Sequence, residues 1–563
     1  MRALALAFAL IPLAAAAAES PDALEIAQRL AANGGAQLAL ARLEQSQPAQ
    51  ASAPRWSEWE LLRIRLLAQL DRPDELLKRL AALPPTGVSD AAMRDMLLQG
   101  ARAALKTSQG KLAREYAART LWRYDVNPTD ARELRLIAIE SYFADGQRDE
   151  AYRSMLRFQQ DYQPLDRPLA TRFVEMLLGA GMDKETVNWL AQVDEASPLR
   201  VLLRLKSGLT SPDAAIAQAR ALLAKSNTAG GWNVLLTAAQ AQRNPVLQIE
   251  AQENLVALSE DGNAREIAAR AAELWRLYQS AAQELGNRNQ LLLGDDAGWS
   301  DFASRQLGAN APASRAMFAY LAAQGKTRET RFGAQLQLVV SLTQARLALT
   351  ALRLFVDPSR FLVQNIDPQA RYQLGIIAAD NRDYYQAVRF WLGLAAPGTV
   401  SADEWQAQLV TALFRAQMID AGSANARKLF EGRTSMPPAL VERLFALGQE
   451  LLDGWHFKVA EDLFAALLPL ADTIKRRDIL FALGRAAEFR ADYRAAADYF
   501  LQSATLLADR ATDAAAQNAR MLSASNMAKA GLRDDARAQY QWLLKNTKDA
   551  ALAESVRREM KKL

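Results

Sequence analysis

The sequence of 563 residues contains no cysteine and only one histidine, His456. Without cysteine the chain has no disulfide, no thiolate metal site, no cysteine nucleophile and no lipid anchor attached to cysteine. A single histidine excludes metal sites built from several imidazoles and leaves one possible partner for a serine–histidine pair. These absences remove many classes of enzyme and metalloprotein.

Aromatic residues are also scarce, at 7%, although half of all residues are hydrophobic. Alanine and leucine supply most of the apolar share, and β-branched residues are few. Ala, Leu, Arg, Gln and Glu lose little conformational freedom when they enter a helix. The composition therefore predicts an all-α protein with a large core.

The sequence lacks a strong excess of either charge. Its 68 basic and 63 acidic residues leave a formal net charge of +5, spread along the chain without a long basic run. A protein that follows a phosphate backbone needs a clustered basic patch or stripe. We therefore expect no nucleic-acid partner.

The only sustained apolar run in the sequence lies at the N-terminus, and it is short. Arg2 precedes an apolar stretch over 3–13, and the alanines at 14–18 permit A-x-A cleavage before Glu19. A membrane-spanning helix needs about 20 apolar residues. The pattern predicts a cleavable signal peptide over 1–18 and a periplasmic protein without a membrane span after cleavage. The absence of cysteine predicts that it is not a lipoprotein.

What the sequence does contain is a repeated pattern with constant internal spacing. A Leu-Gly pair is followed at fixed offsets by an aromatic residue, an alanine and a second aromatic residue. The three copies are Gly375, Tyr384, Ala387 and Trp391; Gly448, Phe457, Ala460 and Phe464; and Gly484, Tyr493, Ala496 and Phe500. We expect the glycine and the alanine to meet where two antiparallel helices approach closely, with the second aromatic residue one turn further along.

This pattern resembles that of the tetratricopeptide repeat (TPR) family, whose helix–turn–helix units are about 34 residues long. The interval from Ala460 to Ala496 is 36 residues, and the interval from Ala496 to Ala536 is 40. The resemblance implies a right-handed α-solenoid of stacked antiparallel helix pairs. The longer intervals leave the shape of its groove undefined.

Weaker copies of the pattern occur near the N-terminus, and a stretch rich in glycine and aspartate interrupts the middle of the chain. Pro128 and Pro164, which are 36 residues apart, are placed to end second helices. The predicted segments are degenerate TPR-like repeats over 19–195, an irregular helical middle over 196–330 with a junction near 284–312, and TPR-like repeats over 331–563.

One candidate site lies in this irregular middle. Asp295 and Asp296 are adjacent carboxylates between glycines and could bind a hard cation. The alternative is a turn that leads into a helix N-cap. Trp299 follows them, and we expect it to be exposed there and to contact a partner protein together with the two aspartates.

A second candidate is the cluster formed by Trp455, His456 and Phe457. It could stack on a ligand or supply an acid–base group. The alternative is purely structural, since Phe457 already belongs to the repeat pattern and His456 would then decorate the turn between helices.

The sequence shows no phosphate-binding loop, zinc-ligand spacing or nucleophile elbow, so we expect neither an enzyme nor a cofactor. The TPR resemblance implies a scaffold that binds other proteins in cell-envelope assembly, secretion or polysaccharide export. The alternative is a glycan-binding or glycan-cleaving envelope protein related to lytic transglycosylases, which carry a similar helical superhelix. Their catalytic glutamate precedes a serine, but Glu554-Ser555 lies too near the C-terminus here for such a domain.

Overall fold

The computed structural model describes residues 23–84, 86–259, 263–285, 295–308 and 310–563. All regular secondary structure in these ranges is helical, which confirms the predicted all-α class. The chain forms two compact units, Met1–Lys225 and Ser226–Leu563, called unit 1 and unit 2 below. The predicted signal peptide and its cleavage site lie outside the described residues, and the three predicted repeat segments stay a prediction.

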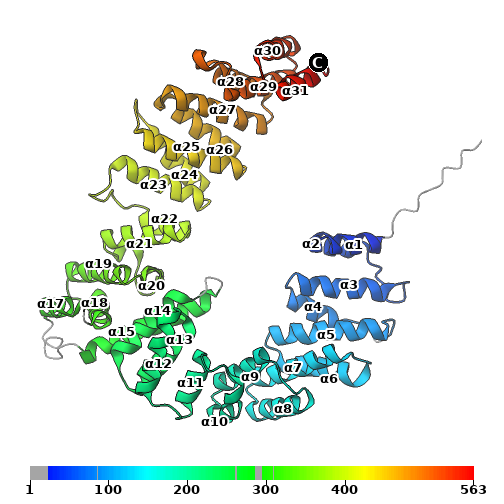
Figure 1. Ribbon diagram of the computed structural model, residues 1–563, viewed down its shortest axis with the longest axis vertical. Helices are drawn as coiled ribbons and strands as arrows, with labels where there is room; N and C mark the ends of the chain where they lie inside the picture. Colours follow the sequence, from blue (N-terminus) through cyan, green and yellow to red (C-terminus); the bar gives the residue numbers. More distant parts are fainter. Residues whose placement is uncertain (1–22, 85, 260–262, 286–294, 309) are drawn as a thin grey trace, which may run out of the picture. The chain divides into compact units, whose positions relative to one another are not determined.

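Unit 1 consists of consecutive helices that pair with their neighbours along the chain (Figure 1). Its elements are α1 (Ala23–Ala32), α2 (Ala36–Ser46), α3 (Trp56–Gln69), α4 (Pro73–Ala81), α5 (Asp90–Lys106), α6 (Gly110–Arg123), α7 (Pro128–Ala144), α8 (Arg148–Asp161), α9 (Arg167–Gly179), α10 (Asp183–Thr186), the 3-10 helix η1 (Val187–Gln192), α11 (Pro198–Lys206) and α12 (Pro212–Lys225). Pro128 is the first residue of α7, a position where its missing N–H costs no hydrogen bond.

Unit 2 begins with a group of helices that is not simply paired along the chain and continues as successive hairpins. The first group is α13 (Ala229–Ala241), α14 (Pro245–Leu258), α15 (Ala264–Leu285), α17 (Asp296–Gln306), α18 (Ala311–Gln324), α19 (Arg328–Gln344), α20 (Ala348–Phe355) and η2 (Val363–Asn365). The second group is α21 (Pro368–Asp380), α22 (Tyr384–Trp391), α23 (Ala402–Arg415), α24 (Ile419–Phe430), α25 (Pro438–Asp453), α26 (Phe457–Leu467), η3 (Leu468–Leu470), α27 (Thr473–Phe489), α28 (Tyr493–Thr505), η4 (Ala508–Arg510), α29 (Ala514–Lys529), α30 (Arg533–Asn546) and α31 (Ala550–Met560). Within each unit, the consecutive helix pairs confirm the predicted α-solenoid class.

Most hairpins share one kind of turn. Two positions before the second helix, a residue with positive φ reverses the chain. In the described part of the chain these residues are Gly34, Asp71, Ser108, Gly146, Gly181, Arg243, Arg346, Arg382, Gln417, Trp455, Ala491 and Gly531. At Arg382 the following N–H, of Asp383, donates to the Ala378 carbonyl at 2.9 Å, which satisfies a carbonyl left free at the helix end.

The glycine of the repeat pattern faces the second aromatic residue, whereas the predicted meeting of glycine and alanine stays a prediction. A Cβ on Gly484 would lie 2.6 Å from the Phe500 ring, and one on Gly375 would overlap the Trp391 indole. Positions at equal distances from a turn face each other, and a helical side chain tilts toward the N-terminus of its helix. The tilt brings Trp391 back over Gly375. Gly448 and Phe464 make the same pair.

The first part of unit 2 departs from simple stacking. Helix α20 packs on α14, and the Thr350 hydroxyl donates to the Glu253 carbonyl at 2.7 Å across 97 residues of sequence. The fully buried Glu253 carboxylate accepts two bonds from Arg315, at 2.6 and 2.5 Å, and one from the Tyr278 hydroxyl at 2.6 Å. Burial, with this carboxylate beside it, raises the pKa of Tyr278 well above its usual value. The cluster ties α14, α15, α18 and α20 together.

Candidate functional site

The residues of the repeat pattern divide into a buried set and a surface set. Ala387, Ala460 and Ala496 are fully buried. Phe464 and Phe500 are fully buried as well, and Trp391 is nearly so. The first aromatic residue of each copy instead begins the second helix and is only partly buried. These residues are Tyr384, Phe457 and Tyr493. These three lie at the surface beside the turns.

In unit 2 the turns border a groove of about 470 Å³. It is lined by Arg382, Tyr384, Phe414, Arg415, Gln417, Leu447, Glu450, Leu451, Gly454 and His456. The Arg415 guanidinium lies 5.4 Å from the centre of the Tyr384 ring and makes two bonds to Glu450, at 2.9 and 2.7 Å. The hydrogen bond to Glu450 is the main reason that the pKa of Arg415 is raised. Aromatic, cationic and amide groups thus share one surface.

Trp455 lies next to this groove and is the most exposed large apolar residue described in unit 2. It is 81% exposed, and its backbone has a φ of 65°. The equivalent turns carry glycine, alanine or polar residues. The Trp455 ring centre lies 5.8 Å from that of Phe457, which stacks on Phe489 at 4.9 Å. The turn therefore presents a tryptophan to solvent in a backbone conformation that favours smaller residues.

His456 does not form an acid–base pair in the structure. Its ring nitrogen Nε2 lies 3.3 Å from Oε1 of Gln417, and this amide is its hydrogen-bond partner among the described residues. The residue precedes α26 in the turn, as the structural alternative predicted. The ring therefore contributes a polar group to the groove wall without an activating carboxylate.

The acidic pair in the middle of the chain caps helices. The Asp295 side chain accepts the Gly298 N–H at 2.9 Å and is the N-cap of α17. The Asp296 side chain accepts the Lys326 N–H at 2.6 Å. Within the described residues, no group of three or more His, Asp and Glu side chains is arranged to hold a metal ion.

The predicted exposure of Trp299 was wrong. The residue is 3% exposed, and its ring lies 5.0 Å from that of Tyr320. The stretch that we expected to be irregular forms α17 from Asp296 onward, and this helix packs on α18. Trp299 therefore belongs to the core between the two helices. Residues 286–294 and 309 of the predicted junction lie outside the described residues.

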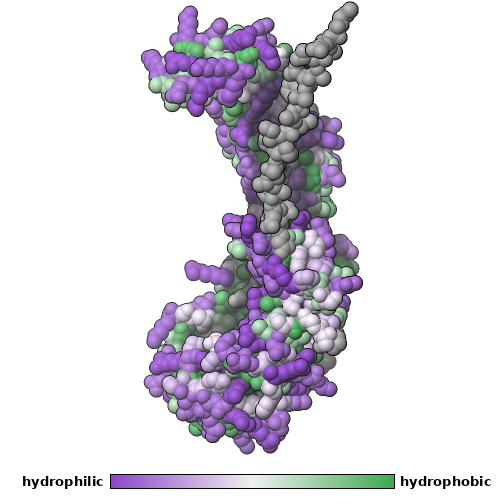
Figure 2. Space-filling view, turned by 90° about the vertical axis from the view of Figure 1, so that its right-hand side faces the viewer, coloured by the Kyte–Doolittle hydropathy of each residue, from purple (hydrophilic) through white to green (hydrophobic). Residues whose placement is uncertain are grey.

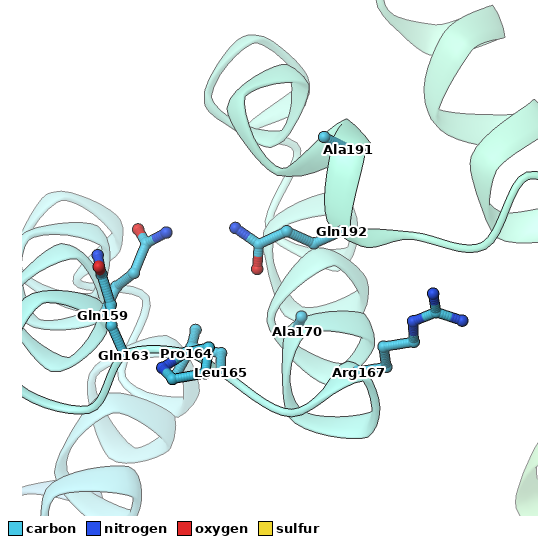
Figure 3. Close-up of a pocket in the computed structure, with 8 residues that line it drawn as sticks. All are labelled: Gln159, Gln163, Pro164, Leu165, Arg167, Ala170, Ala191 and Gln192. Atoms are coloured by element: carbon cyan, nitrogen blue, oxygen red, sulfur yellow. The ribbon is translucent and has the colours of Figure 1, made fainter.

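A cavity of about 550 Å³ in unit 1 escaped the sequence reasoning. It lies between the end of α8, the following loop, the start of α9 and the end of η1. Its lining residues are Gln159, Gln163, Pro164, Leu165, Arg167, Ala170, Ala191 and Gln192. Figure 3 shows Gln192 pointing toward Gln159 and Gln163, whereas Arg167 extends away from them. Three glutamines scattered over 34 residues form no motif, so only the fold brings them together.

The rest of the visible surface is mainly hydrophilic, and its apolar side chains form small separate patches (Figure 2). In unit 1 the most exposed large apolar residue that the structure describes is Trp122, at 88%. None of the described helices combines the length and apolar character needed to cross a lipid bilayer.

Comparisons with family models and with curated proteins return no match. Among solved structures, the chain is similar to the APC/C hetero-tetramer Cut9–Hcn1, with 13% identity, a TM-score of 0.28 and coverage of 96% of this chain and 95% of that chain. It is also similar to Naa15/Naa10 bound to HypK-THB, with 12% identity, a TM-score of 0.31 and coverage of 96% and 91%. Identities and scores at this level assign neither a family nor a partner.

Proposed function

We propose that this protein is a TPR-like scaffold that is exported to the periplasm and binds other proteins there. The observation that carries the proposal is Trp455, 81% exposed in a left-handed turn at the edge of the unit 2 groove. Tryptophan, tyrosine and arginine are the residues most enriched in the energetic centres of protein interfaces. Tyr384 and Arg415 supply the other two in the adjacent groove, which is also lined by His456, the residue after Trp455.

The side chain at the Trp455 turn, rather than its backbone conformation, supports a role in binding. The equivalent turns have the same positive φ but carry glycine, alanine or polar residues, whereas this one presents an exposed indole. Catalysis has no comparable support. Arg415 occupies both oxygens of the Glu450 carboxylate, and His456 faces an amide.

The compartment follows from the sequence pattern over 1–18, which is typical of a cleavable signal peptide. In that compartment the scaffold would serve envelope assembly, secretion or polysaccharide export. The partner would bind beside the turns of unit 2 that border the groove. The helices joined by these turns would fix the spacing between the contact points.

The test is a crosslinking pull-down of the tagged full chain from an envelope fraction, with Trp455→Ala as the variant. Trp122→Ala is the matched control, since it removes an equally exposed indole from unit 1. We expect a small set of recurring proteins that Trp455→Ala loses and Trp122→Ala retains.

Other outcomes would contradict the proposal. Equal capture by both variants would mean that the turn at Trp455 is not the contact site. If no protein recurs but envelope glycan co-purifies in a Trp455-dependent manner, the chain is a glycan-binding protein instead.

A further inference from the structure

We propose that the glutamine-lined cavity of unit 1 binds an extended, uncharged segment of a partner polypeptide through its main chain. The inference rests on the proposed scaffold function and deepens it by naming a second contact site, which lies in unit 1 rather than in unit 2. Gln159, Gln163 and Gln192 line the cavity, and none of their amides hydrogen-bonds to a described residue. Each amide offers two donors and one acceptor.

The same molecule contains a glutamine whose side-chain amide hydrogen-bonds to an extended main chain. In unit 2, the Gln335 Nε2 donates to the carbonyl of Asn365 at 3.2 Å, and its Oε1 accepts the N–H of Asp367 at 2.9 Å. Ile366 between them has an extended backbone, with φ −96° and ψ 142°. One side-chain amide thus satisfies two main-chain groups on either side of a residue. The three free amides of unit 1 are equipped for the same pairing.

The remaining lining favours a peptide over other ligands. Pro164, Leu165, Ala170 and Ala191 are apolar, and the only charged lining residue, Arg167, points away from the amides (Figure 3). The lining therefore places no charged group among the amides. It also contains no aromatic ring on which a sugar could stack. The volume of about 550 Å³ lies within the usual range of ligand sites.

The probe is a pool of fluorescein-labelled, end-capped decapeptides made of Ala, Ser, Thr and Val, titrated with the full chain and followed by fluorescence anisotropy. A second pool carries N-methyl groups on alternate residues, which remove main-chain donors. The test variant is Gln163→Ala with Gln192→Ala. The matched control is Gln160→Ala, which removes an exposed glutamine of α8 that does not line the cavity.

We expect saturable binding of the first pool by the wild-type chain and by Gln160→Ala. Loss of two amides, or N-methylation of the peptides, should weaken binding by about tenfold or more. Circular dichroism checks that the variants are folded. If the double variant is not folded, Gln163→Ala alone is used in its place.

Three results would overturn the proposal. These are absence of saturable binding to the wild-type chain, equal binding of the N-methylated pool, and equal binding by the glutamine variant. Saturable binding of chitotetraose that this variant loses would assign the cavity to glycan. Because the Trp455→Ala pull-down reports on unit 2, failure there and failure here are distinguishable.

Discussion

At the scale of single residues, three glycines set the closest approach of paired helices in unit 2. A methyl group on Gly484 would lie 2.6 Å from the Phe500 ring. We expect Gly484→Ala to lower the free energy of unfolding by about 1–3 kcal/mol, the usual cost of overpacking a core. Urea denaturation followed by circular dichroism measures it.

Gly398→Ala is the matched control, because nothing lies within 4 Å of the added methyl group. A smaller ring partner should restore part of the loss, so Gly484→Ala with Phe500→Leu should be more stable than Gly484→Ala alone. Equal stability of the two single glycine variants would show that the predicted overlap is absent.

Tyr540 gives unit 2 a pH-dependent contribution to stability. Burial, with Glu559 as a lesser cause, raises the pKa of Tyr540 to about 12 from the usual 10.0. Because the folded-state pKa is the higher one, the unfolded chain loses its proton first, and the contribution is complete below pH 10 and lost as the pH rises toward 12.

We therefore expect the free energy of unfolding to fall between pH 10 and 12 with a slope that approaches about 1.4 kcal/mol per pH unit for this group. Tyr540→Phe should remove that share of the slope, as measured by urea titrations at several pH values. The exposed Tyr385 provides the control, and Tyr385→Phe should leave the slope unchanged. A Tyr540→Phe slope equal to that of the wild type would contradict the assignment.

Individual side chains also mark where sequence reasoning reached its limit. Spacing identified Gly375, Gly448 and Gly484 but not the ring that lies against each of them, because the tilt of helical side chains cannot be seen in the sequence. Trp299 was misplaced since glycines and aspartates around it resemble a loop, although Asp295 caps a helix that buries the indole.

At the scale of the element, the repeated turn keeps the same backbone conformation although different residues occupy its positive-φ position. Ala491 has a φ of 59°, a region that costs an L-residue about 1–2 kcal/mol and glycine almost nothing. We expect Ala491→Gly to raise the free energy of unfolding by about 0.5–1 kcal/mol after the greater freedom of glycine in the unfolded chain is included.

The gain is measured as a higher urea midpoint at unchanged slope. Ala530→Gly is the control, because Ala530 has a φ of −79° and should gain nothing from the exchange. If both variants lose stability, the turn at Ala491 is not strained.

The hairpins of the C-terminal repeats could be predicted, because glycine, aromatic and alanine recur at fixed offsets on both sides of each turn. The packing of α20 on α14 could not. It joins residues 97 positions apart through a hydroxyl and a main-chain carbonyl, and no periodicity encodes such a pair. The glutamine cavity was missed for the same reason, since three separate elements supply its amides.

At the scale of the whole molecule, each unit has its own core. One core cluster joins α1 to α7 in unit 1, and another runs from α14 to α23 in unit 2. We expect residues 226–563, produced alone, to be helical and to unfold cooperatively by circular dichroism. They should also keep the Trp455-dependent capture of partner proteins.

A fragment that is soluble but shows no cooperative transition would contradict this independence. Unit 1 produced alone as residues 19–225 supplies the complementary sample. It should bind the decapeptide pool and fail to capture the proteins that depend on Trp455.

The bond between Thr350 and the Glu253 carbonyl closes a loop of 97 residues inside unit 2. Under mechanical tension, ordinary hairpins of a repeat array can detach one at a time from either end. The segment between Glu253 and Thr350 cannot lengthen until α20 separates from α14. Tension applied at the C-terminus should therefore unfold the C-terminal hairpins at a lower force than this segment.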